Sequence, residues 1–257
     1  MCLLIFAYKS HPRYPLLLAA NRDEFHSRPT RAAHFWEEYP DLLAGKDLEA
    51  GGTWMGITGK GRFAAITNLR DPARTAPAER SRGELPLEFL TGRESPPVYL
   101  RRVAARAGDY AGFNLLVRDS GGLWYYSNSP AGIESGPEQL KPGVYGLSNA
   151  MLDTPWPKVI QGKSVLRSAL GGRISHPQLA GAVNNRELAP IEALHQEGLS
   201  GEMDQLLSAQ FIVNPGYGTR ATTTVWLEES GLASWRETSF DPQGQETGVI
   251  TEQLTLA

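Results

Sequence analysis

The chain has 257 residues, with 25 Lys and Arg against 28 Asp and Glu, a formal net charge of −3, five His and one Cys. This length is at the upper end for one hydrophobic core, so we expect a single domain over residues 1–257. The lack of a basic excess argues against a nucleic-acid-binding protein. A lone cysteine cannot form an intrachain disulfide, and no Cys/His spacing resembles a zinc site, so we expect no metal centre.

The start of the chain does not resemble an export signal or a membrane span. Its apolar run is interrupted by Lys9, His11 and Arg13, and no stretch reaches the roughly 20 apolar residues that cross a bilayer. Together with the single cysteine, these features lead us to expect a cytoplasmic protein. The sequence does not indicate an oligomeric state.

The first quarter of the chain predicts a hairpin followed by an irregular region. Residues 3–8 and 16–20 are short apolar runs typical of buried strands, joined by a polar turn. Polar residues occupy positions 21–24 immediately after the second run. Residues 26–50 are rich in Pro, Arg and Asp, and we expect them to be irregular.

Strand and helix patterns follow in blocks along the rest of the chain. Residues 51–57 and 61–68 predict a second hairpin around a Gly-containing turn, and residues 71–83 predict a surface loop. The other predicted strands are 113–117, 123–126, 144–148, 222–227 and 232–238. The predicted helices are 85–90, 99–104, 156–170, 179–183, 191–195 and 203–207. Blocks of strands and helices, rather than regular alternation, favour an α+β layered fold.

Cys2 is the first candidate for chemistry. Initiator methionine is commonly removed before a small residue, which would leave a thiol and an α-amino group on the same carbon. Because an α-amino group titrates near pH 8, it could take the thiol proton, so one residue would supply both nucleophile and base. The simpler alternative is a structural cysteine, since free Cys is among the most buried residue types.

A polar cluster at the predicted strand end could assist Cys2. Arg22 could stabilise a thiolate or a substrate carbonyl, and Asp23 or Glu24 could hold that guanidinium or the new amino terminus. The alternative is a charged turn in which Asn21 forms a local hydrogen bond.

Two asparagines and a late arginine complete the set of candidates. Asn68 and Asn149 each end an apolar strand run, where a carboxamide can donate to a developing oxyanion, although such residues are more often caps or turn formers. Arg220 follows a Gly-containing turn and is either an anion clamp or a solvated loop charge.

An ordered series of motifs resembles one known family. Met1-Cys2 precedes an apolar strand, and Ala20-Asn21-Arg22-Asp23-Glu24-Phe25 follows it. Further matching stretches are GTWMG (52–56), SRGEL (81–85), GFNLL (112–116), LSN (147–149), DTPWPK (153–158) and YGTR (217–220). Together they resemble the NRDE family, also called the Transport and Golgi organisation protein family.

That family is similar to the N-terminal-nucleophile hydrolases of the choloylglycine hydrolase and penicillin V acylase branch. The resemblance implies a four-layer αββα sandwich and hydrolysis that needs no cofactor. By order along the chain, it implies catalytic roles for Cys2, Arg22, Asp23, Asn68, Asn149 and Arg220. Candidate ligand contacts are Asn21, Glu24 and Trp54. The branch has an Asp three residues after its Arg, where this chain has Phe25, so Asp23 or Glu24 must take that place.

Two classes of function follow. The first is an enzyme in which Cys2 attacks a non-peptide amide or thioester carbonyl. The second is a carrier that holds haem or an acyl-CoA in the same cleft, as the family resemblance also implies. The position of Phe25 favours the carrier, and the combination of Cys2 with two Asn and two Arg favours the hydrolase.

Overall fold

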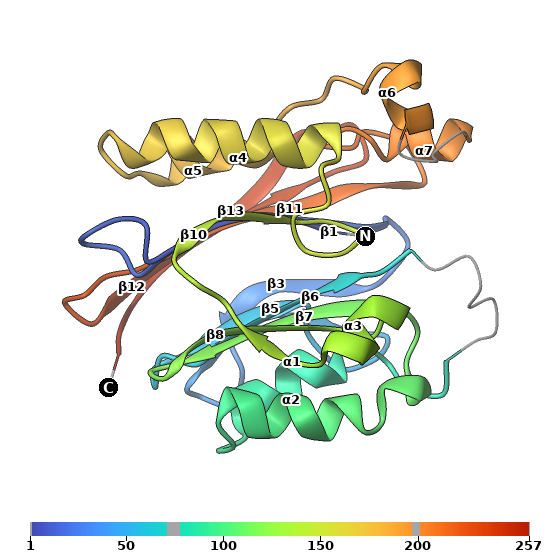
Figure 1. Cartoon of the computed structure of the whole chain (residues 1–257). Coiled ribbons are helices and arrows are strands. Elements are labelled where there is room, and N and C mark those ends of the chain that lie inside the picture. Colours follow the sequence, from blue (N-terminus) through green and yellow to red (C-terminus); the bar gives the residue numbers. More distant parts are fainter. Residues whose placement is uncertain (1, 71–77, 197–200, 257) are drawn as a thin grey trace. The chain divides into compact units, whose positions relative to one another are not determined.

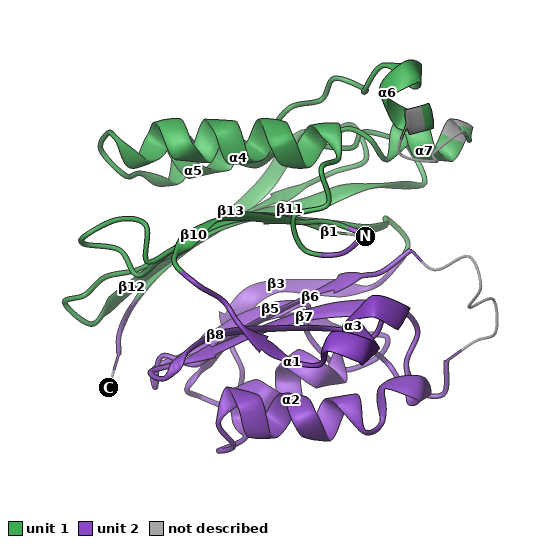
Figure 2. Cartoon of the chain, in the orientation of Figure 1, with its two compact units in different colours: residues 1–27, 142–148, 152–253 green, residues 28–141, 149–151, 254–257 purple. Residues whose placement is uncertain are grey.

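The computed structural model describes residues 2–70, 78–196 and 201–256, and these form two compact units (Figure 2). Unit 1 comprises residues 1–27, 142–148 and 152–253, and unit 2 comprises residues 28–141, 149–151 and 254–257. The single domain expected over residues 1–257 stays a prediction. Within the described ranges, no helix combines the length and the apolar character that crossing a membrane requires.

Unit 1 is built on a six-stranded sheet in the order β10-β1-β2-β11-β12-β13. Its strands are β1 (Cys2–Tyr8), β2 (Leu16–Phe25), β10 (Gly143–Leu147), β11 (Tyr217–Leu227), β12 (Leu232–Phe240) and β13 (Glu246–Thr255). The predicted hairpin of β1 and β2 is confirmed, and β11 pairs antiparallel with both β2 and β12. The amino-terminal strand is therefore an interior strand of the sheet.

The position of the polar cluster corrects one prediction. Asn21 to Phe25 do not follow β2 but form its second half, because β1 pairs with β2 as far as Arg22 and β11 pairs with it as far as Phe25. β11 pairs with all of these polar residues, and β1 also pairs with Asn21 and Arg22, so their side chains are held on a paired strand.

Helices cover one face of the unit 1 sheet (Figure 1). They are α4 (Pro157–Leu170), α5 (His176–Ala180), η2 (Gly181–Val183), α6 (Ile191–Gln196) and α7 (Glu202–Leu206). The fixed φ of Pro157 suits the first helical position of α4. The core between α4, α5, η2 and the sheet consists of Leu3, Ile5, Ala7, Tyr14, Leu17, Ala19, Val159, Leu166, Leu179, Ala182 and Val183.

Gly162 allows α4 to approach β1 and η2 closely. A Cβ atom at this position would lie 2.6 Å from the backbone oxygen of Ala182 and 2.7 Å from Cγ1 of Ile5. We therefore expect Gly162→Ala to lower the free energy of unfolding by about 1–3 kcal/mol in urea denaturation. Gly171→Ala is the matched control, because its nearest new contact would be 3.8 Å away. Equal stability of the two variants would contradict this packing argument.

Unit 2 is built on a seven-stranded antiparallel meander in the order β3-β4-β5-β6-β7-β8-β9. Its strands are β3 (Thr30–Phe35), β4 (Leu42–Asp47), β5 (Met55–Thr58), β6 (Phe63–Asn68), β7 (Phe113–Asp119), β8 (Gly122–Ser127) and β9 (Glu138–Gln139). Its helices are α1 (Glu84–Thr91), α2 (Pro96–Ala104), η1 (Ala107–Asp109) and α3 (Pro130–Ser135). The predicted hairpin of β5 and β6 is confirmed.

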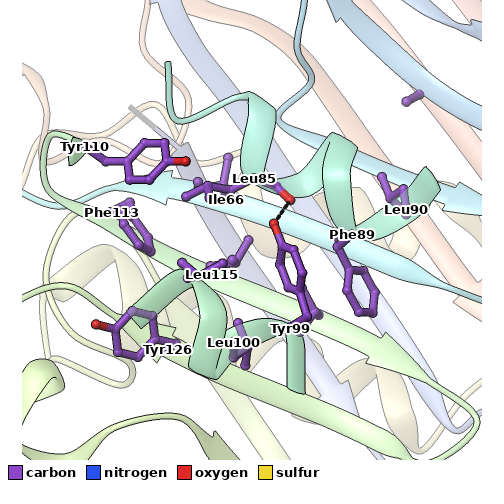
Figure 3. Packing of buried hydrophobic residues seen from close by; sticks show 14 of the residues in the cluster. Ile66, Leu85, Phe89, Leu90, Tyr99, Leu100, Tyr110, Phe113, Leu115 and Tyr126 are labelled. Carbon is purple, nitrogen blue, oxygen red and sulfur yellow. Dashed lines mark hydrogen bonds between the residues drawn. The ribbon is translucent and has the colours of Figure 1, made fainter. Parts of the chain in front are cut away.

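The unit 2 core lies between α1, α2 and the sheet (Figure 3). Phe89 and Tyr99 pack with their ring centroids 5.3 Å apart, and Phe113 packs edge-on against Tyr126. The Tyr99 hydroxyl donates a 2.6 Å hydrogen bond to the backbone oxygen of Leu85 in α1. This bond satisfies the one polar atom of a buried side chain, and the Arg102 guanidinium lies 5.0 Å from the centroid of the same ring.

The irregular region predicted for residues 26–50 is wrong, because it contains β3 and β4. β3 is an edge strand with a register shift between Arg31 and His34, which removes the regular alternation of apolar residues. Strand β13 and the short α3 and β9 were not predicted either. Of the expected loop 71–83, residues 71–77 lie outside the described residues. The α+β class is confirmed, and each unit supplies one sheet layer and one helix layer.

Candidate active site

Three predicted site residues lie side by side where the start of β1 pairs with the second half of β2 in unit 1. Cys2 on β1 pairs with Arg22, and Asp23 pairs with Thr219 on β11. The side chains of Arg22 and Asp23 are buried, and Cys2 is half-buried. Two charged residues within a sheet are costly unless they are paired, so this position is a candidate for function.

Burial raises the pKa of the Cys2 thiol above its ordinary value. The negative charge of Asp23 acts in the same direction, whereas Arg22 and a hydrogen bond with the Asp23 backbone partly oppose the shift. The thiol is therefore protonated at neutral pH. A nucleophilic role for Cys2 requires a base that removes this proton.

Asp23 is held by two residues of β11. The Thr219 hydroxyl donates a 2.7 Å hydrogen bond to Oδ1 of Asp23, and the Tyr217 hydroxyl donates to its backbone oxygen at 3.0 Å. Burial raises the pKa of Asp23, although the Thr219 hydrogen bond, Lys158 and Arg22 favour its charged form. Burial also raises the pKa of Tyr217, and the nearby Asp23 and Cys2 add to this shift.

Lys158 joins this group from α4, and sequence reasoning did not single it out. Its side chain is only 5% exposed, and Nζ donates a 2.7 Å hydrogen bond to the backbone oxygen of Leu207. Burial lowers the Lys158 pKa to about 8, while the charges of Asp23 and Cys2 oppose this shift. Lys158 is the last residue of the DTPWPK motif, which was the available signal.

A β-bulge presents Arg220 next to the same strand end. Thr219 pairs with Asp23 and Ala221 with Arg22, so Arg220 is the extra residue between the two pairs. Bulges re-aim side chains and are frequent near active sites. Nη1 of Arg220 donates to the backbone oxygen of Phe25 at 3.2 Å. Burial lowers the Arg220 pKa, and the like charge of Arg22 lowers it further, so two guanidinium groups lie within electrostatic range.

The remaining residues of the NRDEF motif have other surroundings. Asn21 is buried, its Nδ2 donates to the backbone oxygens of Val183 and Gln210, and its Oδ1 accepts a hydrogen bond from Thr222. The Glu24 carboxylate accepts a hydrogen bond from the backbone of Phe25. The Phe25 side chain is 59% exposed and packs edge-on against Tyr217.

The other three predicted residues belong to unit 2. Asn68 ends β6, and Nδ2 of Asn149 donates a 2.9 Å hydrogen bond to its backbone oxygen. The two asparagines are therefore neighbours within this unit. Trp54 packs against the core and lies over β4, where a Cβ atom at Gly45 would be 2.2 Å from its ring.

Two solved structures resemble this chain in fold. A mutant of the conjugated bile acid hydrolase from Clostridium perfringens has a TM-score of 0.45 and 12% sequence identity, with 98% of this chain and 96% of that chain covered. A Caenorhabditis elegans orthologue of N-acylethanolamine-hydrolyzing acid amidase has a TM-score of 0.43 and 11% sequence identity. This match covers 87% of the present chain and 92% of the amidase chain.

Sequence comparison is more specific. Transport and Golgi organization protein 2 homologs from Bos taurus and Homo sapiens are each 37% identical to this chain. The bovine match covers 96% of this chain and 97% of the relative, and the human match covers 93% of both. The family model described as Transport and Golgi organisation 2 matches residues 1–242. The chain therefore belongs to the Transport and Golgi organisation 2 family.

Proposed function

We propose that the protein hydrolyses a non-peptide amide or a thioester through Cys2. The observation that carries this proposal is the cluster of Cys2, Arg22, Asp23 and Lys158 in unit 1, in which a thiol, a carboxylate and an amine all have shifted pKa values. Perturbed titratable groups with a specific charge partner are typical of catalytic sites.

In the proposed reaction, removal of Met1 leaves a free α-amino group on Cys2. The amine takes the thiol proton, and the sulfur attacks the substrate carbonyl to form a carbon–sulfur bond and an oxyanion. Collapse of this intermediate breaks the bond to the leaving amine or thiol, which receives the proton. The amine then takes a proton from water as the water oxygen attacks the acyl-cysteine, the carbon–sulfur bond breaks to release the carboxylic acid, and the ammonium returns its proton to the thiolate.

The surrounding residues receive roles in this proposal. Asp23, rather than Glu24, holds the new amino terminus, because its carboxylate is buried beside Cys2 whereas that of Glu24 bonds the adjacent backbone. Arg22 and Arg220 favour a substrate that carries an anionic group. The oxyanion-donor roles of Asn68 and Asn149, which both belong to unit 2, stay predictions from the sequence.

Two of the predicted ligand contacts change role in the proposal. We assign Asn21 a structural role in place of a ligand contact, because both the nitrogen and the oxygen of its carboxamide form hydrogen bonds with neighbouring segments. Trp54 likewise receives a packing role in unit 2.

Intact-mass measurement tests the proposal. The tag-free protein is weighed before and after incubation with aryl esters and acyl thioesters of increasing chain length. We expect a mass that lacks one methionine residue and a transient acyl adduct on Cys2, with burst release of the leaving group. A protein that retains Met1 and forms no adduct with any compound would contradict the proposal.

One observation favours the alternative function of a carrier. Burial keeps the Cys2 thiol in its weakly nucleophilic protonated form, while Arg22 and Arg220 remain suited to the propionates of haem or the phosphates of an acyl-CoA. Titration with haemin and with a long-chain acyl-CoA tests this alternative. Stoichiometric binding without turnover, retained in Cys2→Ala, would favour the carrier over the hydrolase.

A further inference from the structure

A cavity lies in unit 1, and it shares no lining residue with the Cys2 cluster. Its volume is about 260 Å³. Residues of α5, η2, β11, β12 and β13 line it, among them His176, Thr222, Thr224, Arg236, Thr238 and Glu246. No step of the proposed hydrolysis uses these residues.

The floor of the cavity is a polar patch of the sheet. Thr222 pairs with Thr238, and Thr224 pairs with Arg236, so these four side chains project from one face of β11 and β12. Directly paired residues have Cβ atoms about 5 Å apart, which gathers three hydroxyls and a guanidinium into one small area. This face also carries Asn21, the partner of Thr222, and it is the face that the helices cover.

His176 fixes one wall of the cavity. Its Nδ1 lies 2.7 Å from the Thr224 hydroxyl and its Nε2 lies 3.0 Å from the Ser234 hydroxyl, while its ring stacks on Trp226. Burial and, to a smaller extent, the positive charge of Arg236 together lower the His176 pKa to about 4. The ring is therefore neutral at physiological pH, and its orientation is set by both hydroxyls.

Arg236 supplies the cation of the cavity. Its side chain is half-buried, and within residues 2–70, 78–196 and 201–256 its guanidinium forms no hydrogen bond or ion pair. Glu246 lines the same cavity, and no salt bridge joins these two described residues. A partly desolvated guanidinium beside hydroxyl groups is a favourable site for a carboxylate or phosphate oxygen.

We propose that this cavity binds the oxyanion of a small carboxylate or phosphate compound, with Arg236 as the charged contact and Thr238 as a hydroxyl donor. The cavity volume admits a compound of metabolite size rather than a macromolecule. Glu246 limits the affinity for a simple anion and favours a ligand that places a hydrogen-bond donor next to its oxyanion.

The proposal is tested by titrating the full chain with inorganic phosphate and, separately, with acetate. The backbone amide shifts of Thr224, Arg236 and His176 are followed by NMR, because these cavity residues lie farther along the chain from the Arg22 and Arg220 pair. Tighter binding of phosphate would indicate a phosphorylated ligand, and tighter binding of acetate would indicate a carboxylate. Absence of shifts at these amides with both ions would overturn the proposal.

Variants separate binding from folding. We expect Arg236→Gln to weaken binding about 10-fold or more and Thr238→Val to weaken it by a smaller factor. Glu246→Gln is expected to strengthen it, because a repulsive charge is removed. Arg167→Gln, at an exposed position on α4, is the matched control and should bind as the unmodified chain does. Equal affinity in Arg236→Gln and Arg167→Gln would contradict the assignment of Arg236.

Discussion

Replacing Cys2 with Ala is expected to lower kcat/KM for an acylating ester or thioester by about 10³-fold or more, because the bond-forming sulfur is lost. Cys2→Ser is expected to lose most of the rate as well, since a hydroxyl is much harder to deprotonate than a thiol. The chain has no second cysteine that could substitute. Steady-state kinetics with the ester that gives the strongest adduct provides the measurement.

A second form of the protein separates the thiol from its proposed base. Placing one glycine before Cys2 keeps the sulfur but moves the free amino group to another residue. If the Cys2 amine is the base, this form should lose most of its rate while alkylation by iodoacetamide still modifies its thiol. If the Cys2→Ala variant kept both its turnover and its melting temperature, Cys2 would be excluded as the nucleophile.

The elements that the sequence predicted correctly are those with a continuous or periodic apolar pattern. β1 and the first half of β2 are almost fully buried, and α4 has proline at its start and glycine after its end. Such patterns arise because one or both faces of the element are buried, so a short stretch of sequence is enough to predict the element. β3 and β13 lie at sheet edges and expose many polar residues, so the same signal is weak there.

The candidate site was predictable only in part for a related reason. Cys2 and Arg22 carry recognisable chemistry within motifs near the start of the chain, whereas the burial of Lys158 depends on how α4 packs against the unit 1 sheet. A lysine in a helix is usually solvated, and only the packed structure distinguishes Lys158 from Lys163 on the same helix. Asn21 is the opposite case, a residue that the motif suggested for the site but that the structure uses for packing. Its side chain donates hydrogen bonds to the backbone of segments distant in the sequence.

Lys158→Met is expected to lower the hydrolysis rate at pH 7 by about 10-fold or more, because it removes the cation that favours the charged form of Asp23. Without this cation the pKa of Asp23 rises further, so the acidic limb of the kcat/KM profile moves to higher pH. In the unmodified protein, Lys158 loses its proton near pH 8, and the rate should fall above that pH. This basic limb should be absent from the variant.

Lys163→Met on the same helix is the matched control for Lys158→Met. It also removes one positive charge, but Lys163 forms an ion pair with Asp153 away from Cys2, with Nζ 2.6 Å from Oδ1. We expect its pH profile to match that of the unmodified protein. Lys158→Met also leaves the backbone oxygen of Leu207 without its donor, which lowers the free energy of unfolding by about 1–3 kcal/mol, so the profiles are compared below the melting transition. A Lys158→Met profile with both limbs unchanged would show that Lys158 only supports the fold, because loss of stability alone does not move the pH at which Asp23 ionises.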